Sequence, residues 1–275
     1  METPVLRPPA VAGRFYPAQP DILKRDLMGY MSAGPGSSPV VDGALGCVAP
    51  HAGYMYSGHV AGAVYRRLPA RPSYIILFPN HTGRGEPLAI MSKGAWQTPL
   101  GAVAVDQKLA EALVDSCHLL KDDAEAHAEE HALEVQLPFL QVRGAEFRFV
   151  PIAVGVGNYA ALELLGHCMA HAVQTASTPV MIVASSDMNH YEPDNITRVK
   201  DRKAIDRMLA LDPNGLYDVV RREHISMCGY GPAVAMLTAA LDLGAKKAEL
   251  VKYATSADTS GDRSAVVGYA GIIVS

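Results

Sequence analysis

Signals that would place this chain outside the cell, in a membrane or on a nucleic acid are missing. Its four cysteines, Cys47, Cys117, Cys168 and Cys228, lie far apart and form no C-x-x-C pair, which is typical of a reduced cytoplasmic protein with free thiols. The formal net charge is −4 and no basic run is present, so a nucleic-acid surface is not expected. No apolar stretch has the length of a membrane span, and residues 1–9 lack the apolar run of a signal peptide. We therefore expect a cytoplasmic protein without membrane or nucleic-acid partners.

Several local motifs that identify common enzyme classes are also missing. The sequence contains no G-x-S-x-G, and Gly83-Arg84-Gly85 does not have the spacing of a dinucleotide or phosphate-binding loop. No internal repeat, charge block or linker divides the 275 residues, which predicts a single domain over residues 1–275. The one low-complexity stretch, residues 32–39, is predicted to be a surface loop.

The composition and the hydrophobic pattern predict an α/β fold. Hydrophobic residues make up 49% of the chain and charged residues 19%, which allows a large core. Strand and helix patterns alternate, so we expect a central, mostly parallel sheet with helices on both faces. An antiparallel annex is expected from residues 88–91 and 102–105, and a helix from residues 125–137. The other predicted strands are 44–49, 74–78, 147–154, 180–184, 250–254 and 265–273, and the other predicted helices are 22–31, 58–67, 106–117 (capped by Asp106), 159–175, 195–211, 214–222 and 231–243.

Three histidines follow three of the predicted strands directly. His51, His81 and His190 come just after residues 44–49, 74–78 and 180–184. Ligands of α/β sheets bind beyond the carboxyl ends of the strands, so these side chains are predicted to share one pocket. A histidine in a loop is more often hydrogen-bonded to the backbone. We apply that interpretation to His59, His118, His167, His171 and His224.

Cys228 and Asp187 are the other candidates for chemistry. Cys228 precedes a predicted helix, whose amino end would lower the pKa of the thiol and favour a thiolate, either a nucleophile or a soft metal ligand. The other three cysteines are interpreted as small buried apolar residues. Asp187 either orients a histidine or caps the turn after its strand. Two imidazoles with one thiolate suit Fe(II) and copper, and zinc is an alternative.

A second pattern overlaps the predicted helix 125–137. His127-Ala128-Glu129-Glu130-His131 matches H-x-x-E-H, the motif of inverted zinc peptidases, in which both histidines share one helical face. The same residues suit an ordinary amphipathic helix. We rank the peptidase interpretation below the strand-end cluster and keep Glu130 and His131 as candidates for the pocket wall.

Taken in order, the motifs resemble those of the Memo family, called AmmeMemoRadiSam system protein B in prokaryotes. The resemblance extends over nearly the whole chain. It is carried by R-P-P-A-V-A-G-R-F-Y-P at residues 7–17, A-P-H-A-G-Y at 49–54, S-G at 57–58, N-H-T-G at 80–83, E-H-A-L-E-V-Q-L-P-F-L at 130–140, S-S-D-M-N-H-Y at 185–191 and C-G at 228–229.

The resemblance implies a fold shared with class III extradiol dioxygenases, which use non-haem iron. On this basis His51 and His81 occupy the positions of two histidine ligands, and His190 that of the acid/base histidine. Cys228 stands where those enzymes have a glutamate ligand, a departure from the dioxygenase pattern. Tyr54 and Asn80, within the matched motifs, are expected in the pocket with Glu130 and His131.

Three classes of function are compatible with these residues. The first is a metal-dependent oxidoreductase that acts on a small, aromatic substrate, with His190 as general acid/base and Asp187 beside it. The second is a metal-free hydrolase in which Cys228 is the nucleophile, His190 its base and Asp187 the group that orients the base. The third is a non-catalytic module that binds a peptide or another ligand. The sequence does not indicate an oligomeric state.

Overall fold

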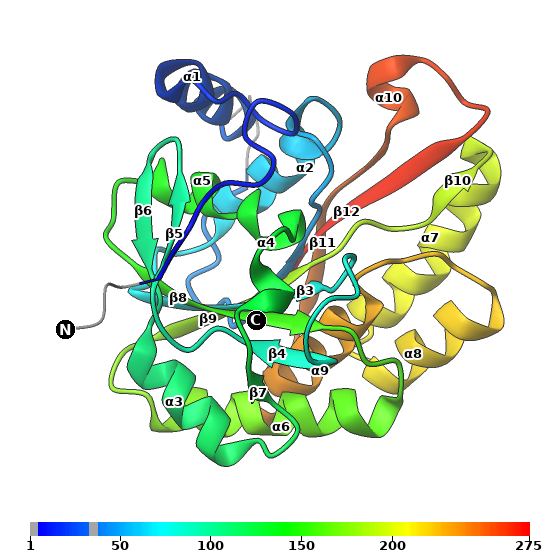
Figure 1. Ribbon diagram of the computed structural model, residues 1–275. Helices are drawn as coiled ribbons and strands as arrows, with labels where there is room; N and C mark the ends of the chain where they lie inside the picture. Colours follow the sequence, from blue (N-terminus) through cyan, green and yellow to red (C-terminus); the bar gives the residue numbers. More distant parts are fainter. Residues whose placement is uncertain (1–4, 33–37) are drawn as a thin grey trace.

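The centre of the molecule is a sheet whose middle strands are parallel. The computed structural model describes residues 5–32 and 38–275 (Figure 1), so positions 33–37 of the predicted loop lie outside the described residues. The middle strands form from short apolar runs rich in β-branched residues, and all four are buried, as expected for parallel strands covered on both faces. In spatial order they are β2 (Gly46–Ala49), β9 (Val180–Ser185), β3 (Ser73–Pro79) and β8 (Arg148–Val154).

The strand pairs at both edges of this sheet are largely antiparallel, so the sheet is mixed. The prediction of a mostly parallel sheet is therefore wrong. A short connection through α10 (Ala257–Ser260) joins β11 (Ala248–Thr255) to β12 (Val266–Val274), and a connection this short returns the chain antiparallel without a crossover. β12 also pairs antiparallel with β2 and with β10 (His190–Glu192). At the other edge, β4 (Leu88–Ile90) pairs antiparallel with β8 and parallel with β7 (Lys121–Asp122).

Helices cover both faces of the sheet, which confirms the α/β class (Figure 1). α2 packs against β2, β11 and β12, while α9 packs against β9, β2 and β3 from the opposite side. Asp106 caps its helix as predicted and accepts a hydrogen bond from Leu109 N at 3.3 Å. None of the helices in the described ranges has the length and hydropathy that a bilayer crossing requires. The long helices are α1 (Pro20–Tyr30), α2 (Tyr54–Arg67), α3 (Gln107–Ser116), α6 (Tyr159–Thr175), α7 (Asp194–Leu209), α8 (Pro213–Arg222) and α9 (Tyr230–Asp242).

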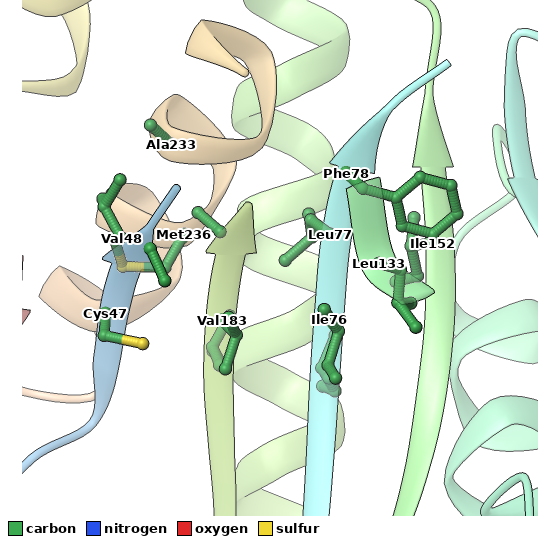
Figure 2. Close-up of a cluster of buried hydrophobic side chains, with 14 of the residues drawn as sticks. Cys47, Val48, Ile76, Leu77, Phe78, Leu133, Ile152, Val183, Ala233 and Met236 are labelled. Atoms are coloured by element: carbon green, nitrogen blue, oxygen red, sulfur yellow. The ribbon is translucent and has the colours of Figure 1, made fainter. Parts of the chain in front are cut away.

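The core consists of the apolar side chains between the sheet and its helices. Figure 2 shows Cys47 and Val48 of β2 and Val183 of β9 in this core, with Met236 of α9 beside Val48. The approach of helix to sheet is close: a Cβ atom at Gly46 would lie only 2.8 Å from the Met236 sulfur. Cys47, Cys117 and Cys168 are all buried, as expected for small apolar residues.

The predicted antiparallel annex is built from different strands. Residues 88–91 join the main sheet as β4, because the run Leu-Ala-Ile is buried against β8. The hairpin instead consists of β5 (Ala95–Thr98), which we did not predict, and β6 (Gly101–Ala104), with β1 (Leu6–Arg7) parallel to β5. Trp96 of β5 is fully buried in the core.

The predicted helix over residues 125–137 is also wrong. The segment breaks into a 3-10 turn (Glu125–His127), α4 (His131–Glu134) and α5 (Leu137–Gln141). Glu130 interrupts it with an extended backbone, φ −77° and ψ 126°, and its side chain accepts from Ala132 N at 3.0 Å as the cap of α4. The carboxylate of Glu130 is fully buried because it binds other groups, described below, and these tertiary contacts override the helical pattern.

A buried carboxylate fastens the amino-terminal segment to this broken region. Glu134, with no exposed surface, forms an ion pair with Arg7 and accepts hydrogen bonds from Ala10 N at 2.7 Å, Val11 N at 3.0 Å and Tyr16 Oη at 2.6 Å. The Arg7 side chain is only 4% exposed and stacks over the ring of Trp96. It also donates hydrogen bonds to the carbonyl oxygens of His127 and Glu130. The segment that precedes the first helix is therefore part of the core.

Replacing Arg7 is expected to destabilise the fold strongly. Arg7→Ala leaves the Glu134 carboxylate buried beside fewer donors, and breaking a buried pair in this way costs about 3 kcal/mol or more. Arg25→Ala is the control, because Arg25 pairs with Asp26 while 73% exposed and should change the free energy of unfolding by less than about 0.5 kcal/mol. Urea unfolding of both variants checks this, and equal stabilities would contradict the role given to Arg7.

Candidate metal centre

The loops that follow β2, β3 and β9 meet at one cavity of about 600 Å³. His51, His81 and His190 all line it, as does Cys228, which lies just before α9 with its sulfur beside His51. His131 and Asp187 also line this cavity. A hollow of about 690 Å³ lies elsewhere, near Asp106 and Arg148, but no histidine or cysteine lines it. The strand-end cavity therefore collects the chemically versatile side chains.

His51 is held rigidly at the bottom of the cavity. It is 2% exposed, and its backbone N–H donates to Asp187 Oδ1 at 2.8 Å. Its ring nitrogen Nδ1 lies 2.9 Å from Ser185 Oγ, and Nε2 lies 3.2 Å from Cys228 Sγ. Burial lowers the pKa of His51 well below its usual value, and the neighbouring histidines lower it further. His51 is therefore a neutral imidazole.

Cys228 does not have the thiolate character that the sequence suggested. Desolvation of the sulfur raises the pKa of Cys228, and the nearby Asp187 carboxylate raises it further. Hydrogen bonds from the Gly229 backbone oppose these effects without overcoming them, so the amino end of α9 is too weak a counterweight. A metal ion bound at this sulfur would have to displace its proton.

Glu130 is a shared hydrogen-bond acceptor for two of the histidines. Its carboxylate accepts from His81 N at 2.7 Å and from His81 Nδ1 at 3.0 Å, and it lies 3.3 Å from His131 Nδ1. Burial alone would raise the pKa of Glu130, but the His81 hydrogen bonds and charge outweigh it and lower that pKa. Burial likewise opposes the charged form of His81, yet Glu130 raises the pKa of His81 overall. His81 therefore donates from Nδ1, which leaves its Nε2 available, whereas His131 makes an ion-pair contact with Glu130.

His190 lies on the far side of the cavity in the short strand β10. Its Nδ1 is 2.9 Å from the Ser226 carbonyl oxygen, which can only accept, so Nδ1 carries a proton and Nε2 does not need one. Its backbone N–H donates to Ser226 Oγ at 2.7 Å. Asn189 Oδ1 in turn accepts from Ser226 N at 3.0 Å. The position of His190 is thus fixed from the loop before α9.

The H-x-x-E-H pattern does not form a zinc peptidase site. His131 lines the cavity, but His127 is buried between the rings of Phe78 and Trp96, and among the described residues neither of its ring nitrogens has a hydrogen-bond partner. Burial lowers the pKa of His127 to about 3. The helix on which the two histidines were expected to share a face is broken between them.

Three residues expected in the pocket do not line it: Glu130, which is fully buried and hydrogen-bonded to His81, and Tyr54 and Asn80. Tyr54 is buried under the loop and donates to the Val135 carbonyl oxygen at 2.6 Å. Asn80 caps its own turn by accepting from Gly83 N at 3.0 Å and donating to the Arg84 carbonyl oxygen at 2.7 Å. Both side chains shape the loops that carry the histidines, and neither lines the cavity.

The cavity wall also contains residues that the sequence patterns did not single out. Phe15 lies against His131, with the ring centroids 4.8 Å apart, and Val267 closes part of the opposite side. Tyr191 is 79% exposed at the cavity and has a φ of 60°, a strained value for an aromatic residue. Such strain is often found at functional sites. The positive φ of Tyr191 could not be read from its residue type.

Comparisons with known proteins show the family to which the chain belongs. The family model for Memo-like proteins matches residues 7–273. The chain is 46% identical over 277 residues to a MEMO1 family protein from Methanopyrus kandleri, covering 97% of this chain and 98% of that protein. It is 45% identical over 270 residues to a MEMO1 family protein from Methanosarcina barkeri, covering 98% and 100%. The chain belongs to the Memo family. The solved structure of an uncharacterized protein from Escherichia coli K12 has a similar fold, with a TM-score of 0.50 at 14% identity over 83% of this chain and 98% of that one.

Close to His190, this Memo-family chain buries another carboxylate, that of Asp201. Asp201 of α7 has no exposed surface, and it accepts from Asn189 N at 2.8 Å and from Tyr253 Oη at 2.7 Å. Burial raises the pKa of Asp201 to about 7, although both hydrogen bonds lower it. An unfolded aspartate titrates near pH ~4, so between about pH 4 and pH 7 the folded state keeps a proton that the unfolded state has lost.

The contribution of Asp201 to stability is therefore expected to fall as the pH rises through this window, and Asp201→Asn should remove that contribution. The free energy of unfolding of the variant, relative to the wild type, should increase between about pH 5 and about pH 8. Asp206→Asn on the same helix is the control, because Asp206 is 53% exposed and pairs with Arg202. Urea unfolding at the two pH values measures the effect, and a constant difference between Asp201→Asn and wild type would disprove it.

Proposed function

We propose that this Memo-family protein binds a redox-active metal ion through His51, His81 and Cys228 and uses it on a small ligand, in the manner of class III extradiol dioxygenases. One observation carries the proposal: a ring nitrogen of each histidine and the Cys228 sulfur all lie within 4.8 Å of one another. Because Nδ1 of each histidine is engaged by an acceptor, the remaining lone pairs are those of Nε2. Metal-binding histidines have this arrangement, in which the second nitrogen is held by a carboxylate or another acceptor.

The donor set fits a borderline or soft cation better than a hard one. Two imidazoles and one thiolate suit Fe(II), copper or zinc, whereas Mg²⁺ and Ca²⁺ require oxygen ligands. The dioxygenase-like role favours Fe(II) or copper. Iron or copper bound here would supply electron-transfer chemistry that the side chains alone cannot perform.

The residues around the donors suit a role in handling a bound ligand. His190 holds its proton on Nδ1 against Ser226, so its Nε2 is the atom that can take a proton from a ligand and return it. Phe15, Val267 and Tyr191 provide apolar walls, and among the residues that the structure describes no arginine or lysine lines the cavity. A small, uncharged or aromatic molecule is therefore a better match than a phosphorylated one.

The metal-free hydrolase is less well supported. Its nucleophile Cys228 contacts His51 Nε2 and not His190, and the raised pKa of the thiol opposes its activation. The same cavity also supports the alternative of a non-catalytic module that binds a peptide or a small molecule. It differs from the enzyme in showing saturable binding without turnover.

Metal content of the purified protein is the first test. Wild-type protein prepared without added metal, or reconstituted with Fe(II) under anaerobic conditions, should contain iron or copper by elemental analysis. His51→Ala, His81→Ala and Cys228→Ser should weaken binding by more than the roughly 10- to 100-fold typical of losing an orienting partner. His190→Ala should keep its metal. His167→Ala is the control, because His167 pairs with Asp242 on the surface.

No bound metal in the wild type, before or after reconstitution, would refute the proposed centre. Loss of metal from His190→Ala to the same extent as from His51→Ala would make His190 a ligand instead of an acid/base.

Oxygen uptake distinguishes the three functional classes. The Fe(II)-loaded protein, supplied with a panel of catechols, should consume oxygen in a chelator-sensitive reaction that His190→Ala reduces at least ~100-fold. Hydrolysis of ester probes that iodoacetamide abolishes and chelators leave unchanged would instead identify the Cys228 hydrolase. Saturable catechol binding without oxygen uptake would identify a binding module.

A further inference from the structure

Ser185, the last residue of β9, sits at the centre of a fully buried hydrogen-bond cluster. Its Oγ lies 2.6 Å from the Ala132 carbonyl oxygen, 2.8 Å from Gln136 Nε2 and 2.9 Å from His51 Nδ1. Ser185 and Gln136 have no exposed surface and His51 almost none. Every proton in the cluster can therefore be assigned from the partners that the structure gives.

The orientation of the Gln136 amide is the first assignment. Its Oε1 lies 2.8 Å from Tyr65 Oη and its Nε2 lies 3.0 Å from the Pro50 carbonyl oxygen. Exchanging the two amide atoms would bring Oε1 against that carbonyl, which can only accept. Gln136 Nε2 is thus a donor to both the Pro50 carbonyl and Ser185 Oγ.

The hydroxyl proton of Ser185 follows. A serine has one proton to give, and the Ala132 carbonyl oxygen at 2.6 Å has no proton of its own, so the hydroxyl donates there. The remaining lone pairs of Oγ accept from Gln136 and from His51. His51 must then carry its proton on Nδ1 and leave Nε2 unprotonated, directed at Cys228 Sγ.

We infer that Ser185 is the residue that fixes the tautomer of His51, with Gln136 and Tyr65 extending the cluster from the cavity to α2. The two histidines of the proposed centre are oriented differently: a carboxylate, Glu130, orients His81, whereas a neutral hydroxyl orients His51. The charge of the proposed centre is thereby kept low on the buried side of the cavity, where a second carboxylate beside Asp187 would be costly to bury.

This inference rests on the proposed metal centre for its functional meaning, but the tautomer can be measured without metal. Nitrogen NMR of metal-free protein labelled with ¹⁵N-histidine distinguishes protonated from unprotonated ring nitrogens, and the His51 signals are assigned as those missing from His51→Gln. The wild type should show His51 with Nδ1 protonated. Ser185→Ala should move the proton largely to Nε2, the form that histidine favours in water, and Ser185→Thr should restore it.

Ser57→Ala is the matched control, because Ser57 is also buried and its hydroxyl also donates to a carbonyl, that of Ala52, at 2.9 Å without touching a histidine. It should leave the His51 signals unchanged. With Co(II) as the probe, competition against a chromophoric chelator should show roughly 10- to 100-fold weaker binding to Ser185→Ala than to Ser57→Ala. The absorption band that arises from the bond between Cys228 sulfur and Co(II) should be weaker in Ser185→Ala than in wild type at the same Co(II) concentration, and Ser185→Thr should restore it.

The outcomes separate the inference from the proposed function. Wild-type His51 protonated on Nε2, or an unchanged tautomer in folded Ser185→Ala, overturns the role of Ser185. If Ser185→Ala does not fold, the wild-type spectrum alone decides. A correct tautomer in a wild type that binds neither Co(II) nor iron supports the Ser185 assignment and refutes the metal centre.

Discussion

The fold and the cavity both depend on the burial of the Glu134 carboxylate. A charged group without exposure requires donors, and here they come from Arg7 and the backbone of the segment that follows it. Satisfying Glu134 draws the amino-terminal segment across the broken helical region. That contact places Phe15 against His131 and fixes the stretch on which Glu130 and Gln136 lie. One buried charge thus joins the start of the chain to the wall of the functional cavity.

Three of the cavity histidines are oriented in the same way: an acceptor holds Nδ1 of His51, His81 and His190, so Nε2 is the nitrogen left over. The acceptor differs from one ring to the next, being a serine hydroxyl for His51, a carboxylate for His81 and a carbonyl for His190. Varying the acceptor varies the basicity of the ring. Glu130 raises the pKa of His81, whereas burial beside a neutral hydroxyl leaves the pKa of His51 well below its usual value.

Much of the architecture could be predicted because the middle strands are apolar runs flanked by loops, and because α3, α6 and α8 begin at side-chain caps. Residues 159–175 form a helix with the predicted bounds, and Asp106 caps its helix as expected. The predictions that failed concern segments whose structure depends on contacts with residues distant in the sequence. The pattern of residues 88–91 predicts a strand both in the expected annex and in the main sheet, and only the pairing with β8 places that strand in the main sheet. Residues 125–137 have a helical pattern that the needs of Glu130 and Glu134 interrupt.

The sequence by itself determined the α/β class, the family motifs and the placement of His51, His81 and His190 after strands, because periodicity and residue order are local properties. Tertiary structure decided the mixed sheet, the separation of His127 from His131, and the protonated state of the Cys228 thiol. It also decided the proton positions around Ser185. Each of these features depends on the groups that surround a side chain after folding removes it from water. Those surrounding groups come from segments that are far apart in the sequence.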